Sequence, residues 1–383
     1  MRTVIIFPPS IFLKRDYDRF QIDFLKKYFV VKVLDFTPFV NKAFWELHKD
    51  KAFICENYFQ IKNKEDFMNL KDNLKSSVII DHLCDKNTNW AKEILKKLDC
   101  TFVQMDVNLI PESSSGLFYK IKKLTNIKYI ISRVLNFLKF QFNFIKARSF
   151  IPDILIVGGL AAKKRSVKRI IHAHSMDYDH YINLKKKNIQ KKNNKPYAVF
   201  LDEDMPNHSD YLLYGIESPI NEKVYYVELF NFFKKFEKHT GLKIKFAAHP
   251  KTDKKKINSY LDNIDVVYGK TAETVLDSKI ALLHCSTSIS FPVLLEKPIY
   301  FLTSNSLKGS WIGNRITNFS KNIDGNLINI SNNLNNQIDL KKIFKYNKKK
   351  YIEYKNQYLK YPDTSDLPLW KLLKDEFTSK KNV

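Results

Sequence analysis

Four short segments in the second half of the chain carry the side chains best suited to chemistry. They are LDEDMPNH (201–208), FAAHPKTD (246–253), HCSTSIS (284–290) and LLEKP (294–298). Each lies where an apolar run ends and polar residues begin, as at the end of a buried strand or helix. Together they supply carboxylates, a histidine and a cluster of hydroxyl groups. Such groups can bind a phosphate leaving group and activate an acceptor hydroxyl, which is the chemistry of sugar transfer from a nucleotide-sugar.

The acidic residues Asp202, Glu203 and Asp204 are the predicted chemical centre. Sugar transfer to a hydroxyl needs a base, or a carboxylate nucleophile if configuration is retained, and an acid at the end of a strand suits either role. Three adjacent carboxylates repel one another, so we expect at least one raised pKa. His208 enlarges the polar cluster. Two other interpretations stay open: an acidic turn that caps the next helix, and an Asp-x-Asp metal site.

His249 follows the apolar run 244–248 and precedes Pro250, which prevents a strand from continuing in its ladder. A histidine at that point can stabilise or protonate a departing phosphate. Lys251 adds positive charge beside it. The alternative is a buried structural histidine. The position of His249, in the same predicted domain as the hydroxyl cluster, favours a phosphate site.

The hydroxyl cluster Ser286, Thr287 and Ser288 follows the apolar run 280–285. Pro292 is tolerated only near the first turn of a helix, which predicts a helix that begins at about residues 288–290. Free backbone N–H groups at its start, together with three hydroxyls, would form a phosphate cradle. Ordinary N-capping without a ligand is the alternative.

A second polar cluster, HAHSMDYDHY (172–181), ends the first half of the chain. His172 and His174 are two residues apart in a predicted strand, so they would share a face. Two histidines without a third fixed ligand are weak evidence for a metal. We therefore assign His174 and Asp177 to the acceptor side of the site.

Apolar runs alternate with helical patterns along the chain, which predicts an α/β fold with mostly parallel sheets. The lysine-rich segment 184–195 has no apolar periodicity and predicts a linker. We expect an acceptor-side Rossmann-like domain over 1–185, a nucleotide-sugar-binding Rossmann-like domain over 196–345, and a helical tail over 346–383. Two such domains facing a cleft make a GT-B architecture, with ligands at the carboxyl ends of the strands.

Residues 117–148 form a basic amphipathic pattern within the first predicted domain. No acid occurs between Glu112 and Asp153, apolar residues recur at helical spacing, and eight lysines and arginines intervene. Such a helix can lie in the headgroup region of an anionic membrane. The alternative is a core-packed helical hairpin whose lysines face water.

The bulk composition narrows the function classes. A net charge of +25 indicates an anionic partner. The four cysteines form no CxxC pair, so the sequence predicts neither a zinc site nor a disulfide framework, which fits a reducing compartment. Residues 1–7 lack the regions of a signal peptide, and the longest apolar run is too short to span a bilayer. No nucleic-acid-binding module is visible, so we expect no nucleic-acid partner.

The order of Asp202–Asp204, His249-Pro250 and Ser286–Ser288 resembles the acidic, His-Pro and Ser/Thr motifs of bacterial sialyltransferases and Kdo-type transferases. The resemblance covers residues 197–303. It implies a CMP-activated acidic sugar as donor (sialic, pseudaminic or legionaminic acid, or Kdo) and a bacterial surface glycan or glycolipid as acceptor. It also implies that His249 and the Ser/Thr pair meet the CMP phosphate. By analogy with GT-B enzymes, Glu296 would contact the ribose or base.

The same resemblance implies no cofactor and no divalent metal. The cysteine pattern and the basic charge predict a cytoplasmic protein that is peripheral at the anionic inner membrane. This chain departs from the pattern in two ways: no glycine follows the acidic segment, and that segment opens the second domain instead of lying in the first. Both departures leave the base and the stereochemistry open. The alternatives are a GT-B enzyme that uses a UDP- or GDP-sugar, and a non-catalytic polysaccharide-assembly or nucleic-acid-binding protein.

Overall fold

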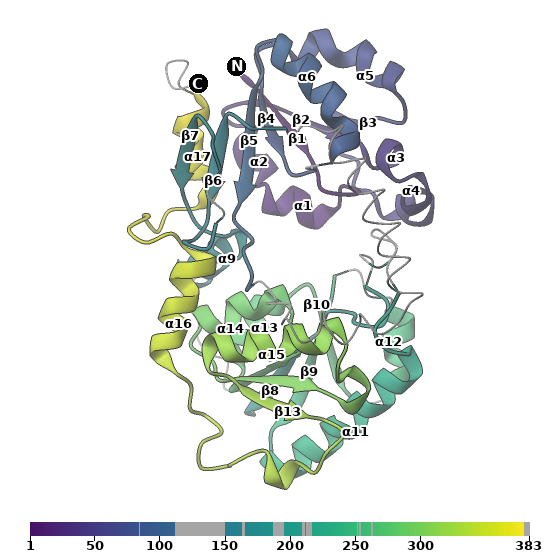
Figure 1. The fold of residues 1–383 in the computed structure, drawn as a ribbon, viewed down its shortest axis with the longest axis vertical. Coiled ribbons are helices and arrows are strands. Elements are labelled where there is room, and N and C mark those ends of the chain that lie inside the picture. The colour runs from purple at the N-terminus through teal and green to yellow at the C-terminus, as the bar shows by residue number, and fades with distance from the viewer. Residues whose placement is uncertain are drawn as a thin grey trace, which may run out of the picture.

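The chain folds into two α/β domains that face each other and are joined by crossing segments on one side (Figure 1). This computed structural model describes residues 1–83, 85–111, 150–162, 165–186, 195–208, 211, 217–250, 252, 254–261 and 263–378. The predicted amphipathic segment 117–148 and the candidate phosphate contact Lys251 lie outside the described residues.

The N-terminal sheet consists of parallel strands in the order β3-β2-β1-β4-β5-β6-β7. Along β1, Val4 and Ile6 enter one hydrophobic core while Ile5 and Phe7 enter another. Both faces of the sheet are therefore buried, as continuous apolar strands require. The bounds are β1 (Thr3–Phe7), β2 (Val30–Asp35), β3 (Tyr58–Gln60), β4 (Val78–Asp81), β5 (Thr101–Asp106), β6 (Ile154–Val157) and β7 (Arg169–His172).

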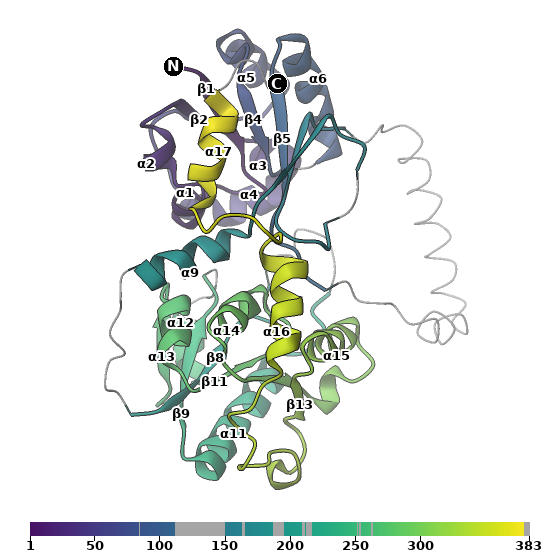
Figure 2. The same ribbon diagram turned by 90° about the vertical axis from the view of Figure 1, so that its left-hand side faces the viewer.

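Helices cover both faces of this sheet (Figure 2). The sequence pattern of residues 18–28 predicts a single helix, but Gln21 has a left-handed backbone (φ 45°), which divides this region into two short helices, α1 and α2. The helices are α1 (Lys14–Arg19), α2 (Ile22–Leu25), α3 (Thr37–Val40), α4 (Lys42–His48), α5 (Lys64–Leu70) and α6 (Asn89–Lys97), with 3-10 turns at Lys49–Lys51, Lys71–Leu74 and Lys86–Thr88.

The C-terminal sheet is also parallel, in the order β10-β9-β8-β11-β12-β13. Its strands are β8 (Tyr197–Leu201), β9 (Lys243–Ala248), β10 (Asp265–Tyr268), β11 (Ile280–Leu283), β12 (Ile299–Thr303) and β13 (Asn326–Asn329). Its helices are α11 (Glu222–Thr240), α12 (Lys254–Tyr260), α13 (Thr271–Asp277), α14 (Ser290–Leu294) and α15 (Trp311–Ile323), with 3-10 turns at Thr287–Ile289, Asn305–Leu307 and Leu334–Asn336.

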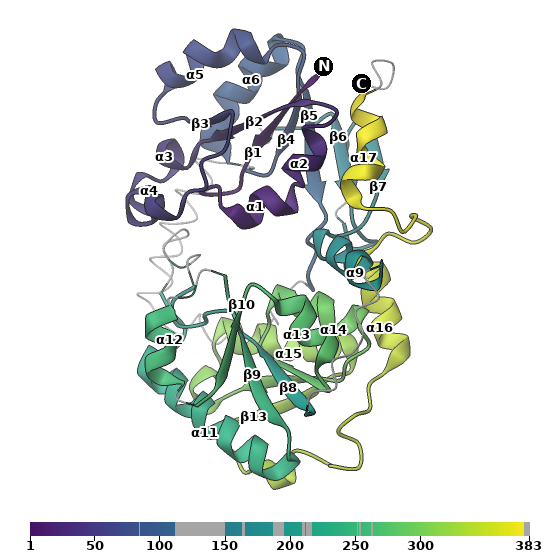
Figure 3. The ribbon, with the colours of Figure 1, turned by 180° about the vertical axis from the view of Figure 1, so that it is seen from behind.

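Two segments cross between the domains (Figures 2 and 3). The first is α9 (Met176–Lys186). The second is the tail, formed by α16 (Lys348–Tyr354), a π-helix (Lys355–Leu359) and α17 (Leu369–Thr378). The tail returns to the N-terminal domain, where Trp370 is fully buried in its core. Gly159 permits this path, because a Cβ there would lie 2.3 Å from the carbonyl oxygen of Gln357.

Both sheets have a Rossmann-type strand order, in which the first strand lies between the second and the fourth. This confirms the predicted α/β fold with two Rossmann-like domains. The apolar pattern of residues 169–177 predicts one strand, but the strand is shorter, because β7 ends at His172 and α9 begins at Met176. Among the described residues, no helix is long and apolar enough to cross a membrane.

Candidate active site

The loops that follow β8, β9 and β11 meet at the carboxyl edge of the C-terminal sheet. These strands are neighbours, and the strand order reverses between β8 and β11. Ligands of open α/β sheets bind at such a reversal, because the loops on either side diverge and leave a crevice. The acidic segment, His249 and the Ser/Thr cluster, far apart in sequence, therefore lie around one crevice.

Asp202 is buried and holds two of these loops together. Its Oδ1 accepts from the backbone N–H of Asp204 at 2.9 Å. Its Oδ2 accepts from the N–H of His249 at 3.0 Å and from the Thr252 hydroxyl at 3.1 Å. Burial raises the pKa of Asp202 to about 6, against the opposing effect of these hydrogen bonds. Since both oxygens are engaged, the geometry gives Asp202 a positioning role.

Glu203 points to the other side of the loop and lines the crevice. Its Oε1 accepts from the backbone N–H of Cys285 at 3.1 Å, so it joins the ends of β8 and β11. Burial raises the pKa of Glu203, while the Cys285 N–H and the positive charge of Arg315 act in the opposite direction. Glu203 therefore places a carboxyl group inside the crevice and close to a guanidinium.

The crevice is a cavity of about 300 Å³, which we call the donor cavity. Of the predicted phosphate-binding residues, His249, Ser286 and Thr287 line it. It is lined by Glu203, Met205, His208, Tyr211, His249, Cys285, Ser286, Thr287, Trp311, Ile312 and Arg315. Basic, hydroxyl and aromatic groups thus converge in it, as binding of a nucleotide requires.

Arg315 and Trp311 were not predicted, although they contribute the guanidinium and the largest aromatic surface of the donor cavity. Both lie on α15, whose N-cap Ser310 accepts from the N–H of Gly313 at 3.1 Å. The start of this helix therefore faces the cavity, where its dipole favours an anion. The segment KGSWIGNR (308–315) after the β12 run carries the signal, a Gly-Ser helix start followed by arginine.

The hydroxyl cluster begins a helical segment near the predicted position. The 3-10 turn Thr287–Ile289 leads into α14 at Ser290, and Ser286 caps the turn by accepting from the N–H of Ser288 at 3.3 Å. The N-capping interpretation therefore holds for Ser286. Ser286 and Thr287 also line the donor cavity, whereas Ser288 is not among its lining residues.

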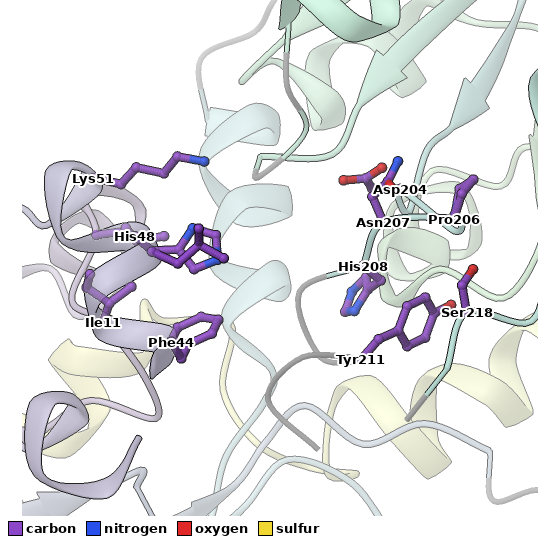
Figure 4. A pocket seen from close by; sticks show the side chains of 12 residues that line it. Ile11, Phe44, His48, Lys51, Asp204, Pro206, Asn207, His208, Tyr211 and Ser218 are labelled. Atoms are coloured by element: carbon purple, nitrogen blue, oxygen red, sulfur yellow. The ribbon is translucent and has the colours of Figure 1, made fainter. Parts of the chain in front are cut away.

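A second cavity of about 340 Å³, which we call the cleft cavity, lies between the two domains (Figure 4). Asp204, in a left-handed backbone conformation (φ 50°), lines it from the C-terminal domain. His208 and Tyr211 line both cavities. The imidazole rings of His208 and His249 are 5.4 Å apart between centroids. The two cavities are therefore neighbours.

The structure places His174 away from both cavities. His174 is fully buried in the crossing region, with its ring nitrogens 3.0 and 2.8 Å from the carbonyl oxygens of Ser175 and Leu367. His174 was expected to contact the acceptor, but its role here is structural. The reason is that the chain leaves the sheet after His172 and turns into α9.

Asp177 also belongs to the crossing region. Its Oδ2 accepts from the Ser290 hydroxyl at 2.6 Å, and its Oδ1 lies 3.4 Å from the Arg19 guanidinium. Asp177 therefore links α1 of the N-terminal domain to α14 of the C-terminal domain, instead of lining a cavity.

Glu296 lies at the opposite edge of the sheet from the donor cavity. Helix α14 starts at the carboxyl edge and carries the chain back to the amino edge, as the helix between two parallel strands must. Glu296 follows α14, is exposed, and accepts from the Tyr346 hydroxyl at 2.7 Å. This corrects the expected ribose contact. Pro250 starts an exposed turn beside His249 and is not among the residues that line the cavity.

Comparison with solved structures shows the fold. A His-to-Ala variant of the wall teichoic acid polymerase TagF is 12% identical over 98% of this chain and 88% of that chain, with a TM-score of 0.52. A second TagF variant, soaked with CDPG, gives the same identity, coverage and TM-score. MurG from Acinetobacter baumannii is 8% identical over 98% of this chain and 99% of that chain, with a TM-score of 0.48.

No family model and no curated protein sequence matches the chain. At these identities the likeness is one of fold alone. The chain has the GT-B arrangement of two Rossmann-like domains with a returning C-terminal helix.

Proposed function

We propose that the protein is a glycosyltransferase, which moves a sugar from a nucleotide-sugar in the donor cavity to a hydroxyl in the cleft cavity. The observation that carries the proposal is the junction of the two cavities at His208 and Tyr211. Phosphate-binding groups line one cavity and a carboxylate lines the next. A sugar at the junction would lie between its leaving group and its acceptor, which is the proximity that transfer requires.

The proposed roles use the residues that line each cavity. Arg315 and His249 would stabilise the negative charge of the leaving phosphate, helped by the hydroxyls of Ser286 and Thr287. Asp204, which faces the cleft cavity, would take the proton of the acceptor hydroxyl, with His208 as the neighbouring candidate. Glu203 would hold Arg315 in place.

We consider two candidate donors. The first candidate is a nucleoside diphosphate sugar carrying UDP or GDP, because neither TagF structure compared above, each with a TM-score of 0.52, is described as a sialyltransferase or a Kdo transferase. A CMP-activated acidic sugar is the second candidate, supported by the order of the acidic, His-Pro and Ser/Thr motifs. The described residues of the donor cavity provide cationic and hydroxyl groups for either leaving group.

A nucleotide panel tests this proposal. The melting temperature of the protein is measured with CMP, CDP, UDP and GDP at equal concentrations. A ligand at one hundred times its Kd stabilises the folded state by about 2.7 kcal/mol, which shifts the melting temperature of a protein of this size by several degrees. We expect one pyrimidine or guanine nucleotide to give such a shift. If none does at millimolar concentration, the donor cavity does not bind nucleotides and the proposal fails.

The Asp204→Asn variant tests the chemistry. Asparagine is tolerated at the left-handed backbone of this position, so the fold should persist. Loss of a general base lowers the rate about 10²- to 10⁴-fold. We expect that loss in kcat, measured with the nucleotide-sugar chosen by the panel, while the nucleotide-induced shift stays unchanged. The control is Asp72→Asn, because Asp72 is exposed and lies on the N-terminal domain. Equal rates in both variants would show that Asp204 is not the base, whereas a wild type that transfers no sugar would point to a non-catalytic assembly protein.

A further inference from the structure

Six residues of the N-terminal domain line the cleft cavity, and four of them are apolar, beside His48 and Lys51. Ile11, Leu13, Phe44 and Leu47 line it, from the loop after β1 and from α4. Ile11 and Phe44 are buried with Trp45 in a small cluster that is separate from the two cores of the N-terminal sheet. This cluster therefore supports the cavity wall and not the sheet. Leu47 is 62% exposed.

The cavity also has two different ends (Figure 4). At one end Lys51 extends from the N-terminal domain toward Asp204 and Asn207 on the other wall. At the other end Phe44 lies opposite Tyr211. Charge thus gathers at one end, and aromatic surface gathers at the other, beside the Ser218 hydroxyl.

The apolar part of this wall does not suit a bare glycan. Each sugar hydroxyl that leaves water needs a hydrogen-bonding partner, because an unpaired buried polar group is costly. The side chains of Ile11, Leu13, Phe44 and Leu47 offer no donor or acceptor. They instead gain from contact with methylene or methyl groups, in proportion to the apolar area that is removed from water.

We propose that the acceptor is an amphiphile, with a hydroxyl-bearing polar end at Asp204 and His208 and an apolar end against Ile11, Phe44 and Leu47. The inference rests on the proposed function, because the cleft cavity adjoins the donor cavity through His208 and Tyr211. It narrows the acceptor from any glycan to a sugar joined to a hydrocarbon, such as a glycolipid headgroup with the first carbons of its chain.

Alkyl glycosides of one sugar and increasing chain length test the proposal. Methyl, butyl, hexyl and octyl β-D-glucoside are used below their micelle concentrations, and dissociation constants are measured by saturation-transfer NMR on the full chain. Each methylene that becomes buried is expected to tighten binding by up to about fourfold. We expect affinity to rise with chain length, and the Leu47→Gln variant to lose at least half of that rise on a logarithmic scale.

Two further variants act as controls. Leu340→Gln removes a comparably exposed leucine from the C-terminal domain and should behave as the wild type. Leu47→Met keeps an apolar side chain and should retain the dependence on chain length. Affinity that is independent of chain length, or that rises equally in Leu47→Gln, would overturn the proposal, and the second result would mean that the alkyl chain binds elsewhere.

The nucleotide-induced shift in melting temperature is recorded for every variant. If that shift persists while affinity is independent of chain length, the amphiphile proposal fails and the glycosyltransferase proposal stands. If no nucleotide gives a shift in the wild type, the proposed function itself fails.

Discussion

Arg315 contributes a guanidinium charge to the donor cavity. It lies on α15, the helix that follows β12, and outside the predicted motifs. Its charge opposes the rise in the pKa of Glu203. A phosphate would take over part of that interaction. The leaving-group contact and the carboxylate beneath it are therefore coupled through one guanidinium.

This coupling gives a first prediction. A hydrogen bond to a charged partner contributes about 1.5–3 kcal/mol, so Arg315→Ala should weaken nucleotide binding by roughly ten- to a hundredfold. Isothermal titration with the nucleotide selected by the panel measures the change. Lys308→Ala, which removes an exposed cation from the loop before the same helix, is the control. Equal losses in the two variants would show that only net charge matters.

His284 illustrates a histidine that the sequence places beside the site but the fold uses for stability. It is fully buried under the donor cavity. Its Nδ1 is 2.7 Å from the Leu302 carbonyl oxygen, and its Nε2 is 3.1 Å from the Tyr225 hydroxyl. These partners fit a neutral ring that donates from Nδ1 and accepts at Nε2. Burial lowers the pKa of His284 to about 4.

The second prediction follows from the sign of this shift. The unfolded chain binds a proton at His284 below about pH 6.5 and the folded chain only near pH 4. Stability is therefore lost as the pH falls through that window, by about 1.4 kcal/mol per pH unit. His284→Gln should flatten the slope of unfolding free energy against pH between 6.5 and 4 by that amount, measured by urea unfolding. An unchanged slope in His284→Gln would contradict this prediction. His180→Gln, at an exposed site, is the control.

At the scale of elements, the crossing segments connect the two domains and fix their relative position. Asp177 joins α1 to α14, and Asp179 accepts from the backbone N–H of Leu369 at 2.7 Å. Helix α17 then inserts Leu369, Trp370, Leu373 and Phe377 into the core of the N-terminal domain. The end of the chain therefore completes the domain that the start of the chain builds.

The third prediction concerns this helix. Trp370 is fully buried, and its Nε1 donates to the carbonyl oxygen of Arg19 at 2.8 Å. Trp370→Ala should lower the unfolding free energy by about 3–5 kcal/mol, because it leaves a cavity and an unpaired carbonyl. Leu367→Ala, at a partly exposed site, should change it by less than about 1 kcal/mol. Urea unfolding of both variants makes the comparison. If Trp370→Ala lowers the unfolding free energy as little as Leu367→Ala does, α17 contributes little to the core.

At the scale of the whole molecule, the net charge of +25 indicates an anionic partner. An amphiphilic acceptor would be presented at a lipid surface. Lysines near an anionic surface each contribute about 1 kcal/mol of attraction, and that attraction falls off within the Debye length. We therefore propose that the protein is peripheral at an anionic membrane.

The fourth prediction tests that placement. The protein should float with vesicles that contain 30% phosphatidylglycerol in 0.1 M NaCl, and should be released in 0.5 M NaCl, because salt screens the attraction. Vesicles of phosphatidylcholine alone are the control. Binding to both kinds of vesicle without salt dependence would favour apolar insertion over charge attraction.

The sequence by itself determined the alternation of strands and helices and therefore the fold class. Buried parallel strands are continuous apolar runs, and this signal is local. It located the loops after β8, β9 and β11, which lie at one edge of the sheet because parallel strands all end there. Of the residues that it proposed in those loops, Glu203, His249, Ser286 and Thr287 line the donor cavity, whereas Asp202 and Ser288 do not. The break at Gln21 was missed because it depends on a single left-handed residue.

Only the tertiary structure decided which of these side chains face a cavity. Asp202 and Glu203 are adjacent and equally acidic, yet one ties loops together and the other lines the donor cavity, because neighbouring side chains point to opposite sides. Helix α14 runs from the carboxyl edge of the sheet to its amino edge, so Glu296 lies far from the donor cavity. His174 is buried where the chain crosses between the domains. Arg315 and Leu47 joined the site through contacts between distant segments, and no local periodicity specifies such contacts.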